Sequence, residues 1–238
     1  MKVNHIQHHD RGFTLVELLV VIVIIAALAG LTAPKLISMR KKGDQVVAMN
    51  NGRSMVLSMN DFSTEYGTLP DRETAKQVTD LTGSKLNLNG DSANDYFRQL
   101  IASGMLKSED PFYSKTPYST KKPDNNMTGS KALEAGEVGF GYIMNGNAAI
   151  STDDPNRVIA ATPLLNATTK GQFDPGPLDG KAALVYLDSS VKLMQIREDN
   201  KKVAIPGSKT LLDAGEGTLW GPDIKPVLKA PLKKGAKK

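Results

Sequence analysis

The sequence predicts an α+β fold, in which a long N-terminal helix packs on a small antiparallel sheet in a loop-rich head. Three observations lead to this prediction. An unbroken apolar run occupies residues 18–31, and a stripe of apolar side chains at three- and four-residue intervals continues to about Tyr66. Four short segments rich in apolar or β-branched residues then follow in the C-terminal half. The chain has 21 glycines and 13 prolines, which favours many turns and long loops.

The apolar run is long enough to cross a membrane. Residues 13–33 contain a single ionisable side chain, Glu17. As a helix they would extend roughly 31 Å, close to the bilayer core of about 30 Å. On an insertion scale, the summed gain of the leucine, isoleucine and valine side chains outweighs the few kcal/mol that one acidic residue costs. We therefore expect this segment to insert despite Glu17.

Two ordinary kinds of targeting segment fit the run poorly. A cleaved secretory signal has a small-residue cleavage site after its apolar core, and Ala33-Pro34-Lys35 is a poor site of that kind. A plain signal anchor would explain the length of the run. It gives no reason for a carboxylate near the start of the apolar stretch.

A third kind of segment explains the carboxylate. A short polar leader ends at Gly12, and Phe13-Thr14-Leu15-Val16-Glu17 leads into the run. These residues resemble the class III signal of type IV pilins and type II secretion pseudopilins, and the similarity extends to Pro34, where that family commonly carries a helix-kinking proline. The resemblance implies cleavage between Gly12 and Phe13 by prepilin peptidase and N-methylation of Phe13.

Glu17 is the predicted assembly residue. A carboxylate inside a membrane is costly unless it is paired, so it is a candidate functional group with a partner to be found. Cleavage would create a positively charged amine on Phe13. In the family, the glutamate of an incoming subunit is thought to pair with this amine on its neighbour. The alternative is an acid that is tolerated near the membrane edge.

The orientation follows from the resemblance and not from charge counting. Four positive charges (Lys35, Arg40, Lys41 and Lys42) follow the apolar run, and two precede it, which favours a cytoplasmic C-terminal side. The family has the reverse orientation. We expect a single-pass protein of the bacterial inner membrane with a periplasmic head, which later joins a periplasmic pseudopilus or a cell-surface fibre.

Beyond Pro34 the helix is expected to continue as an amphipathic half to Tyr66, with Gly67 as its C-terminal cap. Its apolar stripe, which is expected to pack against the head, consists of Met39, Val46, Met49, Met55, Met59, Phe62 and Tyr66. Gly43 and the Asn50-Asn51-Gly52 segment weaken the pattern and predict a kink or local melting.

The head is predicted to contain loops, one short helix and four strands. Residues 71–91 are expected to form a loop, a short helix follows between a Ser92 cap and Gly104, and residues 107–136 form a long irregular stretch. The predicted strands are 138–144, 157–161, 182–187 and 191–196, the last two joined by a turn at 188–190. The expected division of the chain is a cleaved leader 1–12, a transmembrane and assembly half-helix 13–34, an amphipathic half-helix 35–66, a head 67–224 and a basic flexible tail 225–238.

The residue inventory argues against catalysis. Cysteine is absent, and all three histidines (His5, His8 and His9) lie in the leader. A processed chain would therefore lack the side chains of catalytic triads and of most transition-metal sites. We expect no enzyme and no cofactor. Calcium is an alternative, since that ion takes oxygen ligands; the candidate ligands are Asp153, Asp154, Asp174, Asp179 and Asp188, although solvated surface acids are the preferred interpretation.

The formal charge of +5 is concentrated in the tail, where residues 225–238 contain six lysines and no acid. Because aromatic residues are not interleaved with these lysines, no specific nucleic acid is expected as a partner. The resemblance implies a structural subunit of a type II secretion pseudopilus. The alternatives are a type IV pilin subunit for adhesion, motility or DNA uptake, and a membrane-anchored binding module that does not polymerise. The implied partners are prepilin peptidase, identical or related pseudopilins, and the inner-membrane secretion or pilus assembly machinery.

Overall fold

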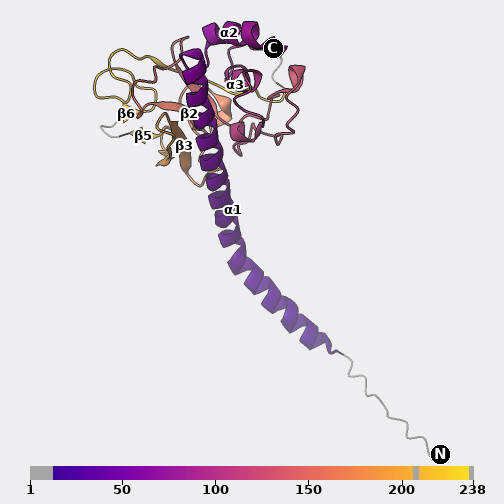
Figure 1. Ribbon diagram of the computed structural model, residues 1–238. Coiled ribbons are helices and arrows are strands. Elements are labelled where there is room, and N and C mark those ends of the chain that lie inside the picture. The colour runs from indigo at the N-terminus through magenta and orange to yellow at the C-terminus, as the bar shows by residue number, and fades with distance from the viewer. Residues whose placement is uncertain (1–12, 206–208, 236–238) are drawn as a thin grey trace, which may run out of the picture. The chain divides into compact units, whose positions relative to one another are not determined.

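The computed structural model describes residues 13–205 and 209–235, and of Pro34 the backbone alone. The chain divides into two compact units after Arg40. The structure has a long helix and a five-stranded antiparallel sheet, which confirms the predicted α+β class. Figure 1 shows the long helix and the strands of the head. The predicted leader 1–12, with its cleavage residue Gly12, lies outside the described residues.

Helix α1 extends over Leu15–Tyr66 and contains 52 residues. Its predicted end is confirmed, because Gly67 has a φ of 81° and its N–H donates to the carbonyl of Ser63 at 2.9 Å. A left-handed residue after the last turn is the usual way to close a helix, and glycine adopts it without a steric cost. The backbone is helical through Pro34, and the kink expected there stays a prediction.

Residues 41–66 of α1 form the centre of the head. Met55, Met59 and Phe62 are fully buried, as the amphipathic stripe predicts. Met39 and Val46 are exposed, so their assignment to the stripe was wrong. The helix is continuous through Asn50-Asn51-Gly52, so the local melting expected there does not occur. Gly52 permits the helix to approach the sheet closely.

Two shorter helices follow. Helix α2, Arg72–Thr82, corrects the loop predicted over 71–91. Asp71 caps it by accepting hydrogen bonds from the backbone N–H groups of Glu73 and Thr74, each at 2.9 Å. Tertiary packing of a short buried face, Thr74, Ala75 and Val78, stabilises α2. A face of this size gives little apolar periodicity in the sequence. Helix α3, Ala93–Ala102, is capped by Ser92 as predicted.

The sheet is antiparallel throughout, with the strand order β4-β3-β2-β1-β7. Its strands are β1 Gly141–Asn145, β2 Val158–Thr162, β3 Lys181–Tyr186, β4 Val191–Gln195 and β7 Pro226–Lys229. The first four confirm the predicted strands to within a few residues, and the turn between β3 and β4 includes Ser189 with a φ of 65°. Two short strands, β5 Ala204–Ile205 and β6 Lys209–Thr210, pair separately.

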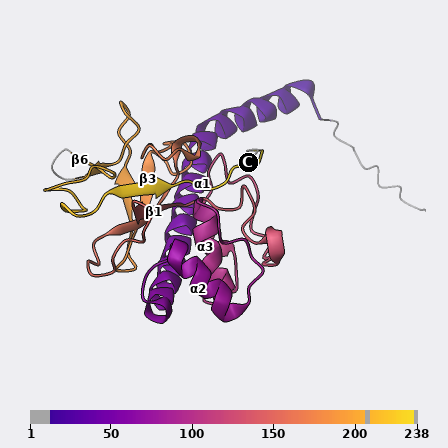
Figure 2. The ribbon, with the colours of Figure 1, turned by 90° about the horizontal axis from the view of Figure 1, so that it is seen from above.

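The sheet separates two apolar cores. On strand β1, Tyr142 and Met144 belong to the core that contains Met55 and Phe62 of α1, whereas Ile143 belongs to the opposite core. This alternation follows from the two-residue period of a strand. Figure 2 shows α2 and α3 beside the C-terminal half of α1.

The tail corrects a second prediction. Residues 226–229 are strand β7, which pairs with β1, and the carbonyl of Leu232 accepts a hydrogen bond from the N–H of Gly136 at 2.9 Å. Lys229 is buried, and its Nζ donates to both carboxylate oxygens of Asp91 at 2.8 and 2.9 Å. The basic flexible tail predicted over 225–238 is therefore part of the folded head up to Leu232.

Candidate functional site

The N-terminal half of α1 presents an apolar surface. Within residues 15–37 the exposed fraction of the large apolar side chains ranges from 47 % at Val21 to 83 % at Leu15. An apolar surface of this extent marks contact with a membrane or another protein. By length and composition, α1 can cross a membrane. The predicted membrane segment therefore lies on a helix whose apolar side chains are not covered by other residues of the same compact unit.

Glu17 lies in the first turn of this helix and is exposed. Its Oε2 accepts hydrogen bonds from the backbone N–H of Thr14 at 2.9 Å and from the Thr14 hydroxyl at 2.7 Å. The Thr14 Oγ1 in turn accepts a hydrogen bond from the N–H of Glu17 at 3.2 Å. This reciprocal pair is a capping box, in which two residues satisfy the free N–H groups at a helix start.

The capping box gives Glu17 a local role that sequence reasoning missed. The signal was present, since threonine followed three residues later by glutamate is the signature of this cap. A negative charge in the first turn also interacts favourably with the helix dipole. Thr14 supplies only neutral donors, so the charge of Glu17 is hydrogen-bonded but not neutralised by this contact.

Phe13 stands two positions before the first helical residue and is exposed. The predicted processing residue Phe13 and the predicted assembly residue Glu17 therefore both lie at the N-terminal end of α1. The cleavage bond itself involves Gly12, which is outside the part of the chain that the structure describes. Cleavage, methylation and the assembly role stay predictions.

Comparison with known proteins bears on this same segment. The family described as the prokaryotic N-terminal methylation motif matches residues 7–33. The chain carries this methylation motif. The matched residues include Gly12, Phe13 and Glu17, the residues of the predicted processing and assembly signal.

Two curated relatives are similar to part of the chain. The chain is 30 % identical over 82 residues to the type IV major pilin protein PilA of Myxococcus xanthus (strain DK1622). The match covers 30 % of this chain and 37 % of PilA. The chain is 33 % identical over 66 residues to the type II secretion system core protein G of Pectobacterium carotovorum subsp. carotovorum, covering 28 % and 42 %. The similarity therefore spans about two fifths of each relative. No solved structure matches the chain.

The acids proposed as calcium ligands are not brought together. Asp154, Asp174 and Asp188 each accept a hydrogen bond from a backbone N–H two residues further on, as in ordinary turns. Asp179 lies 3.9 Å from Lys41, and Asp153 is exposed. Among residues 13–205 and 209–235, the one group of three acids within reach of a single ion is Glu109, Asp124 and Glu137.

Proposed function

We propose that the chain is a structural subunit of a type II secretion pseudopilus and supports protein export. Prepilin peptidase cleaves it between Gly12 and Phe13, Phe13 is N-methylated, and the subunits polymerise through their N-terminal helices. The methylation motif, the exposed apolar half of α1 and the similarity to type II secretion core protein G support this role. The subunit acts as a building block and not as an enzyme.

The observation that carries the proposal is the single carboxylate of Glu17 on an otherwise uncharged apolar surface from residue 13 to residue 33. Neutral hydrogen bonds from Thr14 leave its negative charge uncompensated. When neighbouring helices or lipid replace water around α1, an unpaired charge becomes costly. The amine that cleavage creates on Phe13 of a neighbouring subunit is the complementary group, and their pairing sets the register of the fibre.

The proposal includes an orientation. The leader is accessible to the peptidase in the cytoplasm, the apolar half of α1 crosses the inner membrane, and the head is periplasmic. The positive charges at Lys35 and residues 40–42 favour the reverse orientation, so accessibility of a head cysteine to an impermeant reagent is a direct check. Identical or related pseudopilins and the inner-membrane machinery are the partners in this arrangement.

A type IV pilin is the second candidate, favoured by the 30 % identity to PilA. Such a subunit would build a cell-surface fibre for adhesion, motility or DNA uptake. Deleting the chain's gene separates the two functions: loss of protein export with surface fibres retained supports the pseudopilus, and the converse supports the pilin. A cleaved subunit that never co-sediments with any fibre would be a membrane-anchored binding module.

Substitutions at the two capping residues test the role of Glu17. Glu17→Gln keeps an oxygen that can cap α1 but removes the charge, whereas Thr14→Val removes the two cap hydrogen bonds of the Thr14 hydroxyl and keeps the charge. We expect Glu17→Gln to be inserted and cleaved normally but absent from sheared fibres, and Thr14→Val to assemble. Fibres of normal yield from Glu17→Gln would reduce Glu17 to a helix cap and contradict the assembly role.

A further inference from the structure

Glu109 is a fully buried acid that anchors the irregular segment between α3 and β1. Its Oε2 accepts a hydrogen bond from the backbone N–H of Asn125 at 2.9 Å, and its Oε1 accepts one from the N–H of Leu133 at 2.8 Å. Asn125 and Leu133 have φ values of 56° and 47°, in the left-handed region that side chains disfavour. The segment therefore folds around this carboxylate at two points of unfavourable backbone conformation.

Glu137 brings a second buried carboxylate to the same place. It is 1 % exposed, and its Oε2 accepts a hydrogen bond from the N–H of Glu134. Its Oε1 is buried and accepts no hydrogen bond from the described residues. The nearest ammonium, Nζ of Lys121, lies 3.9 Å away and donates to Glu134 instead. A buried carboxylate oxygen without a donor is costly unless something else binds it.

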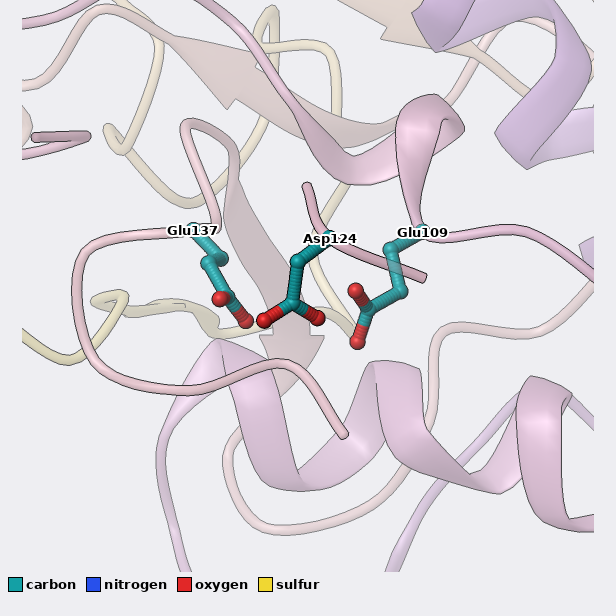
Figure 3. A group of neighbouring side chains, drawn as sticks. All are labelled: Glu109, Asp124 and Glu137. Atoms are coloured by element: carbon teal, nitrogen blue, oxygen red, sulfur yellow. The ribbon is translucent and has the colours of Figure 1, made fainter. Parts of the chain in front are cut away.

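Asp124 completes the group from the exposed side. Figure 3 shows it between Glu109 and Glu137, with the three carboxylates turned toward one another. One oxygen from each residue lies within 4.8 Å of the others. Burial, together with repulsion from Glu109 and Asp124, raises the pKa of Glu137. Three converging acids, two of them buried, form an arrangement that a cation would stabilise.

The geometry points to a Ca²⁺ site formed by Glu109, Asp124 and Glu137, in which the ion is bound by the carboxylate of Glu137, whose Oε1 accepts no hydrogen bond from the described residues. The ligands are all oxygens, which Ca²⁺ and Mg²⁺ prefer. Mg²⁺ keeps several of its waters and binds through one or two carboxylates, whereas Ca²⁺ takes about six to eight oxygen ligands, so three carboxylates from one segment favour Ca²⁺. Water completes the coordination from the side of exposed Asp124.

A bound ion would join three points of one irregular segment. Glu109 precedes the short 3-10 helix Asp110–Phe112, Asp124 lies in the middle of the segment, and Glu137 leads into strand β1. Because the ion binds the folded arrangement and not the unfolded chain, it stabilises the head by mass action. This site is separate from the Asp153–Asp188 region that the sequence suggested for calcium.

The test uses the full chain in detergent micelles after removal of metal with a chelator. Calorimetric titration with CaCl₂ is expected to give one ion per chain, a rise of several degrees in the melting temperature, and at least tenfold weaker binding of MgCl₂. Absence of both heat and thermal shift with CaCl₂ would overturn the proposal. Binding of MgCl₂ as tightly as CaCl₂ would overturn the assignment to Ca²⁺.

Three variants separate ion binding from a packing role. Asp124→Asn removes a charge but keeps the acceptor for its turn hydrogen bond from the N–H of Asn126 at 2.8 Å, and at least a tenfold loss of Ca²⁺ affinity is expected. Glu137→Gln is expected to lose the same affinity, yet without Ca²⁺ to melt no lower than the unsubstituted chain, because repulsion is relieved. Asp153→Asn, an exposed acid elsewhere, is the control and keeps full affinity.

Two results would contradict ion binding by these residues. If Asp124→Asn and Glu137→Gln bind Ca²⁺ as tightly as the unsubstituted chain, the three acids do not form the site. If Glu137→Gln lowers the melting temperature equally with and without Ca²⁺, its carboxylate has a packing role and not a ligand role.

Discussion

Gly52 of helix α1 lies directly against Val185 of strand β3. A Cβ atom on Gly52 would be 2.8 Å from Cγ2 of Val185 and 3.3 Å from Cγ2 of Val191. Real Cβ atoms do not approach a neighbour as closely as the first distance, so the helix approaches the sheet at a spacing that only glycine permits. This contact positions residues 41–66 of α1 on the sheet.

The same substitution at two glycines of α1 is expected to have opposite effects. Alanine is favoured over glycine within a helix by about 1 kcal/mol, and Gly43 has open space around its Cβ position, so Gly43→Ala should stabilise the chain by roughly 0.5–1 kcal/mol. At Gly52 the overpacking cost of about 1–3 kcal/mol exceeds that gain, so Gly52→Ala should destabilise. Denaturant unfolding measures both changes, and equal stabilisation by the two variants would contradict the contact.

Asp91 links three elements of the head and gives stability a defined pH dependence. It accepts hydrogen bonds from Lys229 on β7 and from the Tyr96 hydroxyl on α3 at 2.7 Å, and Arg72 on α2 lies 3.5 Å away. Burial opposes the charge of Asp91, yet these donors outweigh burial and lower the pKa of Asp91. Burial and Asp91 raise the pKa of Tyr96 to about 12, so its hydroxyl stays a donor at neutral pH.

Asp91→Asn should therefore destabilise the head above the ordinary aspartate pKa of about 3.9. The stabilisation by a carboxylate with a lowered pKa is present above that value and is lost as the pH falls through the lower folded-state pKa. Since the Asp91 side chain is 49 % exposed, we expect a loss of about 1–2 kcal/mol, and not the larger cost of breaking a fully buried pair. Thermal unfolding at pH 7 and below pH 3 is the measurement, and a difference that does not shrink at low pH would contradict the pairing.

Local signals made the main elements predictable. The apolar run, the Met55–Met59–Phe62 stripe and the Gly67 cap define α1 and its end, since each acts within a few residues. Helix α2 was missed in spite of its local caps, Asp71 and Gly83, because only a small face of it is buried. Strand β7 was missed because it lies in a lysine-rich segment whose Lys229 is paired with Asp91, far away in the sequence.

The candidate sites differ in how far apart their residues lie in the sequence. Phe13 and Glu17 were chosen because they are adjacent to the apolar run, and their roles stay predictions; the Thr14 cap was overlooked. The group of Glu109, Asp124 and Glu137 was not predictable, because its members are widely spaced in a segment without periodic structure. Only tertiary folding brings these three carboxylates together.

Two truncations test the corrected view of the tail. Ending the chain after Leu232 removes four lysines, a glycine and an alanine but keeps β7, whereas ending it after Lys225 removes β7 and exposes the edge of β1. We expect the first variant to keep the melting temperature of the full chain. The second should lose cooperative unfolding, because buried Leu228 and the Lys229–Asp91 pair are lost together. Equal stability of the two variants would mean that the tail is dispensable.

Mass spectrometry of the protein isolated from its native membranes tests the central claim most directly. Processing at Gly12 removes twelve of the 238 residues, so the account predicts a chain that begins with N-methylated Phe13 and retains Glu17. A protein that still carries residues 1–12, or that begins after residue 33, would contradict assembly through the N-terminal helix.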